Sequence, residues 1–262
     1  MSIQVLVATM HQEDHSLLEK MNVQSDAIIS NQCGKNSIEE FVWRGYRIKY
    51  LNFNERGVGL NRNNSLMRAE ADICIFADDD VVYVDNYSSL IEGFYEQHPE
   101  ADVVIFNLLV TRNGKTKNIV KETKRVGRKG LTSFGTFSIS IRRNAIRRAN
   151  IYFHLDFGGG AKFSCGEDTI FLQDCVKKDL IVYTCTETIG FVNHGVSTWF
   201  QQFNDKFFYD KGVLFHHISN HLAKAIALYH CLKHRKLYSD YGWVKAYMKM
   251  LRGIDDANKD II

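Results

Sequence analysis

Three consecutive aspartates, Asp78, Asp79 and Asp80, are the residues of this sequence with the clearest chemical potential. They follow the apolar run ICIFA, which starts at Ile73 and is typical of a strand buried on both faces of a parallel sheet. Adjacent carboxylates repel one another unless a cation lies among them. Hard oxygen ligands suit Mg²⁺ or Mn²⁺, which commonly bridges to a substrate phosphate. The alternative is an acidic turn that caps the next helix, although a cap needs only one such residue.

Two further segments have features of a binding site. Residues 54–63, NERGVGLNRN, place glycines and then Arg62 and Asn63 at the entrance of a predicted helix. Backbone N–H groups at such a place can approach a phosphate, and an arginine adds positive charge. Glu167 and Asp168 follow Gly166 at the start of another predicted helix. On the residues alone, this second pair indicates acids favoured by the helix dipole.

Strands and helices alternate over the first hundred residues, which predicts an α/β fold with a mostly parallel sheet covered on both faces. The predicted strands are residues 3–8, 27–30, 47–51, 73–77, 102–110, 136–141, 181–185 and 189–192. Helices are predicted over 16–21, 60–71, 86–97 and the segment after Gly166, with a polar loop or hairpin over 111–129. Three successive glycines predict a flexible loop over 157–163. The sequence contains neither GxxxxGK[ST] nor GxGxxG after the first strand, which argues against a P-loop or dinucleotide site.

The composition is that of a globular protein, with 45% apolar and 24% charged residues among 262. No apolar run is long enough for a membrane-spanning helix, and the amino terminus does not resemble a signal peptide. The six cysteines lack metal-ligand spacing, so we expect reduced thiols in a cytoplasmic protein. Positive charge gathers between Arg112 and Arg148, where twelve Lys or Arg accompany one acid. This block indicates either a polyanionic partner or a solvated surface.

Residues 198–262 are predicted to be helical. A stripe of Leu214, Ile218, Leu222, Ile226 and Tyr229 is followed by an aromatic and apolar face beside a lysine face. Such a pattern suits an anionic membrane surface, and it equally suits packing on the catalytic domain or on a second subunit in a homodimer.

The segment GLNRNNSLMRAEADICIFADDD resembles the part of family-2 glycosyltransferases that reads G…RN…A…FLDxDD, and GEDTIFL resembles their later Glu-Asp motif. With QVLVATM in the first strand, the resemblance covers roughly residues 1–200. It implies a GT-A fold over 1–197 with a helical extension over 198–262. It also implies a nucleotide-sugar donor held through Mn²⁺ or Mg²⁺.

Site roles follow from the resemblance, position by position. Asp168 would be the general base, with Glu167 beside it, in an inverting transfer to an acceptor hydroxyl. The metal ligands would be Asp80 and Asp78, with His194 as a third candidate. Residues expected to bind the donor are Thr9, Asn31, Gln32, Arg62, Asn63, Asp78 and Asp79. A mobile loop and an aromatic side chain are common in sugar recognition, so Gly159, Gly160 and Trp199 are expected to bind the acceptor, although Trp199 equally suits a core anchor for the helical tail.

One departure affects the nucleotide. The family usually ends its second strand with an acidic residue, whereas this chain has Asn31 and Gln32. Amides donate as well as accept hydrogen bonds, so the base is less constrained, and UDP is the first expectation.

The sequence therefore predicts a metal-dependent glycosyltransferase of bacterial surface polysaccharide or glycan synthesis. We expect a glycan or lipid-linked acceptor, peripheral contact with the inner face of the membrane, and no nucleic-acid partner. One alternative is a phosphatase of the haloacid-dehalogenase type, with Asp78 as nucleophile and Asp80 as general acid. That pattern normally lies on a first strand, and here other strands precede it. A second alternative is a non-catalytic module that binds nucleotide-sugars or membranes.

Overall fold

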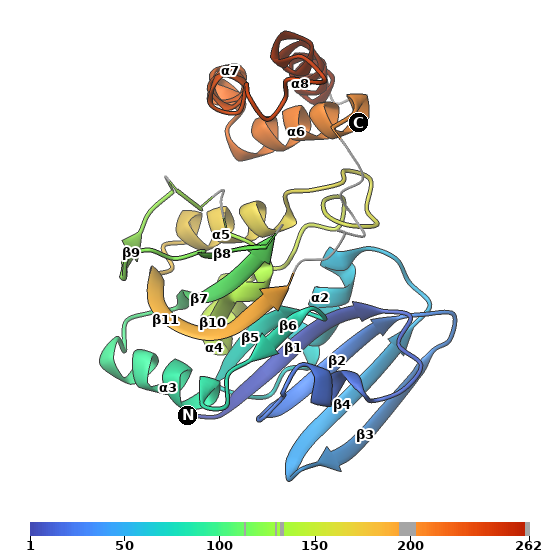
Figure 1. Ribbon diagram of the computed structural model, residues 1–262, viewed down its shortest axis with the longest axis vertical. Coiled ribbons are helices and arrows are strands. Elements are labelled where there is room, and N and C mark those ends of the chain that lie inside the picture. The colour runs from blue at the N-terminus through green and yellow to red at the C-terminus, as the bar shows by residue number, and fades with distance from the viewer. Residues whose placement is uncertain (113, 129, 132–133, 194–202, 260–262) are drawn as a thin grey trace.

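The computed structural model describes residues 1–112, 114–128, 130–131, 134–193 and 203–259. A large central sheet is flanked by helices, and three C-terminal helices stand at one end of the molecule (Figure 1). In the described residues eleven strands form one sheet, in the order β3-β4-β2-β1-β5-β10-β7-β11-β6, with β8 on β7 and β9 on β11.

The strands are β1 (Ile3–Met10), β2 (Asp26–Gln32), β3 (Ser37–Trp43), β4 (Tyr46–Phe53), β5 (Ile73–Asp78), β6 (Val81–Tyr83), β7 (Val103–Arg112), β8 (Lys115–Asn118), β9 (Lys124–Val126), β10 (Ile139–Arg142) and β11 (Val182–Asn193). The helices are α1 (Leu17–Lys20), α2 (Val58–Arg68), α3 (Tyr87–Gln97), α4 (Arg143–Ala149), α5 (Glu167–Lys177), α6 (Asp205–Ile218), α7 (Ala223–Lys233) and α8 (Trp243–Asn258).

The parallel strands β4, β2, β1 and β5 carry the predicted site at their carboxyl ends. Successive side chains of a strand point to opposite faces, so Val5 and Val7 join one core cluster and Leu6 the other. Helices α1 and α3 cover the first face, and α2, α4 and α5 cover the second. Burial on both faces explains the continuous apolar runs, and it confirms the predicted helix-flanked α/β sheet.

Several elements differ from the prediction, among them the short strand β6 after the aspartates, which pairs with β11. Strand β3 was not predicted; it pairs antiparallel with β4 through a tight turn in which Arg44 and Gly45 have φ of 49° and 87°. The two predicted last strands are one strand, β11, interrupted by irregular pairing between Cys185 and Gly190. Residues 136–141 begin with a 3-10 turn, and helix α4 follows β10 directly. The sheet is therefore mixed: β10 lies antiparallel between β5 and β7 in its middle, and β6 pairs antiparallel with β11 at one edge.

Helices α6, α7 and α8 share a separate apolar core that includes Phe208, Tyr238 and Met250. Helices α6 and α8 approach closely where Gly212 and Gly253 lie. A Cβ at either glycine would collide with the backbone of the facing helix, so the absence of a side chain permits the approach. A smaller cluster joins Val213 and Leu214 of α6 to the rest of the molecule. In the described part of the chain, no helix combines the length and apolarity needed to cross a bilayer. The division at residue 197 stays a prediction.

Candidate functional site

The aspartate run lies where the sheet turns from strand to loop. Asp78 ends β5 opposite Ala8 of β1, so the aspartates and Thr9 share the carboxyl edge of the parallel strands. Thr9 Oγ1 donates a hydrogen bond of 2.5 Å to Asp79 Oδ2. Desolvation and the adjacent charge of Asp78 raise the pKa of Asp79 in spite of that bond. The edge is thus an acidic site whose charge a cation would stabilise.

Arg62 of α2 joins this edge to the second acidic pair. Its side chain is only 5% exposed, and its terminal nitrogens lie 2.7 Å from Asp78 Oδ1 and 2.9 Å from Glu167 Oε1. Burial would lower the pKa of Arg62, but the charges of Asp78 and Glu167 raise it, so the guanidinium stays charged. The arginine predicted to bind the donor is engaged by two carboxylates, and it holds the ends of β5 and α5 together.

Glu167 and Asp168 occupy the first turn of α5, after Gly166 with φ of 114°. Asp168 is partly buried, and desolvation together with the neighbouring Glu167 raises its pKa to about 6. Arg62 and Lys211 oppose that rise. A carboxyl group with such a pKa is deprotonated at neutral pH yet basic enough to accept a proton, as general-base catalysis requires.

The glycine loop lies against both α2 and the acids. Val58 N, at the start of α2, donates to Gly159 O at 2.9 Å, and Gly158 N donates to Phe163 O at 2.8 Å. Gly158 has φ of 105°, and a Cβ there would lie 2.8 Å from the Glu167 carboxylate. Only glycine fits this approach. The segment contains no helix or strand, but backbone hydrogen bonds close it into a defined turn.

Three amides predicted to bind the donor hydrogen-bond to the protein. Asn31 Oδ1 accepts from Gln12 N at 3.0 Å, and Gln32 Oε1 accepts from Gly57 N at 2.9 Å. Asn63 bonds to both the N–H and the carbonyl of Phe153, at 2.8 and 2.9 Å. All three are buried and hold the loops at the carboxyl edge. Their contact with a donor stays a prediction.

Sequence reasoning missed the contribution of α6. Asp210 is 1% exposed, and its Oδ2 accepts from Ser164 N and Oγ at 2.8 and 2.7 Å and from Lys206 Nζ at 2.7 Å. These bonds fasten α6 to the segment that precedes α5, and Lys211, one residue along, lowers the pKa of Asp168. The available signal was Lys206 four residues before Asp210, a spacing too common on helix surfaces to stand out.

The carboxylate oxygens of Asp78 and Asp80 are ligands of the kind that a hard divalent cation prefers. The described residues contain no group of three His, Cys, Asp or Glu positioned around one ion. Mg²⁺ in phosphate-transferring sites is nevertheless commonly held by one or two carboxylates, substrate phosphates and water. Asp78 and Asp80 could supply those carboxylates. His194 and Trp199 lie outside the described residues.

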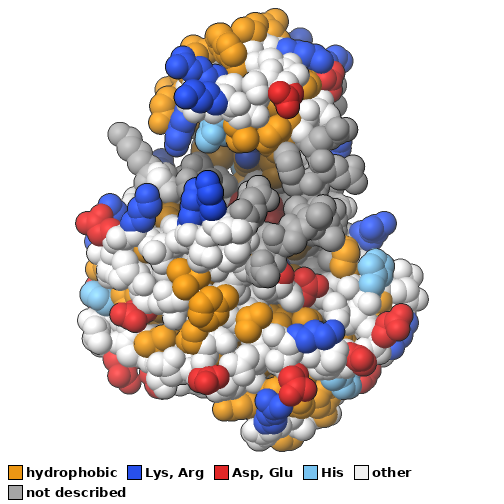
Figure 2. All heavy atoms as spheres, in the orientation of Figure 1, with side chains coloured by type: hydrophobic (Ala, Val, Ile, Leu, Met, Phe, Trp, Pro, Cys, Tyr) orange, Lys and Arg blue, Asp and Glu red, His pale blue; other side chains and the backbone are white. Residues whose placement is uncertain are grey.

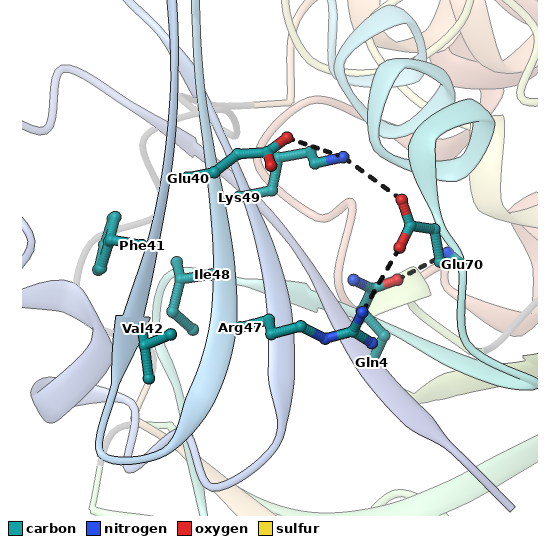
Figure 3. Close-up of a pocket in the computed structure, with 8 residues that line it drawn as sticks. All are labelled: Gln4, Glu40, Phe41, Val42, Arg47, Ile48, Lys49 and Glu70. Atoms are coloured by element: carbon teal, nitrogen blue, oxygen red, sulfur yellow. Dashed lines mark hydrogen bonds and ion pairs between the residues drawn. The ribbon is translucent and has the colours of Figure 1, made fainter.

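A separate cavity of about 280 Å³ lies beside β3 and β4 (Figure 3). It is lined by Gln4 and Arg47, which are near the amino ends of β1 and β4, away from the aspartates. Its charged groups pair with one another, since Lys49 lies 3.1 Å from Glu40 and 3.6 Å from Glu70. Ligands of open parallel sheets bind at the carboxyl ends of strands, so this cavity is not the predicted donor site.

Comparisons with known proteins agree with this geometry. Residues 30–161, just over half of the chain, match the family described as glycosyl transferase family 2. No protein among those with curated functions matches.

Two solved structures illustrate the fold. S. aureus TarS 1-349 in complex with UDP-GlcNAc has a TM-score of 0.59 and 15% identity, over 82% of this chain and 66% of that one. The chain thus spans about two thirds of the length of that TarS fragment. A mannosyltransferase, PcManGT from Pyrobaculum calidifontis, in complex with GDP-Man and Mn²⁺, has a TM-score of 0.50 and 11% identity, over 98% and 87%. The fold is the GT-A fold of these transferases, as expected from the sequence, and the chain belongs to glycosyl transferase family 2.

Proposed function

We propose that this protein transfers a sugar from a nucleoside diphosphate sugar to an acceptor hydroxyl, with inversion at the anomeric carbon. The observation that carries the proposal is the Arg62 bridge, which brings Asp78 and Glu167 to one guanidinium. The two acidic motifs, far apart in the sequence, thereby meet at the edge of the sheet where ligands bind. Membership of family 2 supports the transferase over the phosphatase alternative.

On the donor side, Asp78 and Asp79 would orient the nucleotide or sugar, and Asp80 with Asp78 would hold Mn²⁺ or Mg²⁺. Such a cation, when bound, neutralises charge that develops on the leaving diphosphate. UDP is the first choice of nucleotide. The similar structures were solved with UDP-GlcNAc and with GDP-Man and Mn²⁺, which supports a nucleotide-sugar donor and a divalent metal.

On the acceptor side, Asp168 would take the proton of the attacking hydroxyl. The acceptor oxygen forms a bond to the anomeric carbon while the bond from that carbon to the diphosphate oxygen breaks. Arg62 holds Glu167 in place through a hydrogen bond of 2.9 Å, and the charge of Glu167 raises the pKa of Asp168. Attack opposite to the leaving group inverts the configuration.

The acceptor is proposed to be a glycan, free or carried on a lipid, as in bacterial surface polysaccharide synthesis. Gly159 and Gly160 lie in the loop that contacts Glu167 through Gly158, which supports an acceptor place next to the base. Trp199 stays a candidate for the same pocket.

A nucleotide-release assay tests the proposal. The protein would be incubated with UDP- and GDP-sugars, with and without Mn²⁺, in the presence of candidate oligosaccharides. We expect Mn²⁺-dependent release of one nucleoside diphosphate, and a product whose anomeric configuration by NMR is opposite to that of the donor. Retention of configuration would overturn the inverting mechanism. Hydrolysis of a simple phosphate monoester, without nucleotide release, would favour the phosphatase.

A further inference from the structure

Helix α7 is apolar on two sides, and only one of them is covered. Ala223, Ala227 and Cys231 pack into the core of the three C-terminal helices. On the other side Leu228 and its neighbour Tyr229 are 39% and 65% exposed, and Leu232, four and three residues further on, is 46% exposed. Helices that are apolar all round are normally buried all round, so the exposed stripe of α7 is a surface that the described part of the chain leaves open.

Positive charge lies directly beside that stripe. The end of α7 and the turn that follows it read Leu232-Lys233-His234-Arg235-Lys236-Leu237, and Leu237 is 58% exposed. Lys233, Arg235 and Lys236 are exposed. Within the described ranges, no carboxylate lies within 4.0 Å of these three, whereas Lys224 and Lys249 form ion pairs. In Figure 2 hydrophobic side chains gather over the end of the molecule formed by these helices, with Lys and Arg beside them.

The exposed stripe of α7 and residues 232–237 are together called the α7 surface. We propose that the α7 surface docks onto an anionic lipid bilayer. Apolar side chains would enter the boundary of headgroups and acyl chains, while the three cations would meet acidic headgroups. Docking would suit a transferase whose acceptor is carried on a lipid, as proposed above. The docking itself can be measured without any transfer activity.

The positive charge of the C-terminal helices favours a bilayer over a second copy of this chain as the partner of the α7 surface. Residues 203–259 contain ten Lys or Arg and five Asp. A two-fold contact through the α7 surface would bring the cations of both copies together, and like charges in contact oppose association. An anionic bilayer complements the same surface, because each basic residue near it contributes favourably.

Vesicle flotation of the full chain tests the proposal. One set of vesicles contains phosphatidylcholine alone and the other equal parts of phosphatidylcholine and phosphatidylglycerol. We expect binding only to the anionic set, and less binding at higher salt. Arg235→Glu/Lys236→Glu should weaken binding by about thirtyfold or more, at ~1 kcal/mol for each basic residue lost. Leu232→Ser/Leu237→Ser should also weaken it, with an unchanged circular dichroism spectrum.

A matched control uses the other basic region. Lys115→Glu/Lys117→Glu reverses two exposed charges on β8 and should leave flotation unchanged. Loss of binding in this control alone would overturn the proposal in favour of the block between Arg112 and Arg148. Equal binding to both vesicle sets, or none, would also overturn it. A concentration-dependent dimer that Leu232→Ser/Leu237→Ser dissociates would assign the surface to a second copy.

Discussion

The two acidic clusters of the site have the same kind of side chain but different surroundings. Asp78 ends strand β5 with its side chain 36% exposed, and Asp79 follows it at the open edge of the sheet. Glu167 is only 14% exposed at the start of a helix, and Asp168 beside it has its pKa raised to about 6. Carboxylates at an open edge suit the binding of a cation and a phosphate, whereas an enclosed carboxylate suits proton transfer. The surroundings of the two acidic clusters therefore assign them different roles.

The largest expected effect is a loss of transfer activity when the enclosed cluster is changed at Asp168. Asp168→Asn removes the proposed base with little change of shape, so transfer should fall by about 10²–10⁴-fold while donor affinity stays nearly unchanged. Steady-state rates and donor titration of the same preparation measure both. Normal transfer by Asp168→Asn would remove the catalytic assignment.

The bridge between the clusters can be broken at Arg62. Arg62→Ala would leave Asp78 and Glu167 facing each other without their shared cation, at a cost of about 3–5 kcal/mol in free energy of unfolding. Denaturant titration measures this. Arg47→Ala is the matched control, because Arg47 bonds to Asp26 at the surface and should matter little. Equal effects of the two substitutions would contradict the structural role of Arg62.

The open cluster is tested by Asp80→Ala. Loss of a metal ligand should weaken Mn²⁺-dependent donor binding by at least about tenfold, without changing the affinity for nucleotide measured in the absence of metal. Calorimetric titration with and without Mn²⁺ distinguishes the two. Unchanged Mn²⁺ dependence would place the metal elsewhere.

A last effect concerns the pH dependence of stability. The folded state keeps the Asp168 proton up to about pH 6, whereas an ordinary aspartate loses it near 3.8. The folded state therefore binds more protons in this window, and this residue makes stability fall as pH rises through it. Asp168→Asn should stabilise the protein by about 3 kcal/mol above pH 6 and only slightly near pH 4. The exposed Asp179→Asn should show no such difference in melting temperature.

Local patterns predicted the parts of the site that lie within single segments. The strand before Asp78 and the helix that begins after Gly166 were predicted from the apolar run and the apolar spacing, and the structure confirms both. Contacts between segments could not be predicted in this way. Arg62 and Glu167 are 105 residues apart, and their contact depends on how α2 and α5 pack on the sheet. The buried Asp210 depends likewise on the docking of α6.

A thermal-shift series with nucleoside diphosphates, with and without Mn²⁺, tests the central division of roles most directly. A ligand at a hundred times its dissociation constant adds ~2.7 kcal/mol of stability, which raises the melting temperature visibly. We expect a Mn²⁺-dependent shift with UDP or another nucleoside diphosphate, retained in Asp168→Asn and lost in Asp80→Ala. The absence of a shift with every nucleotide, or its loss in Asp168→Asn and retention in Asp80→Ala, would contradict the account.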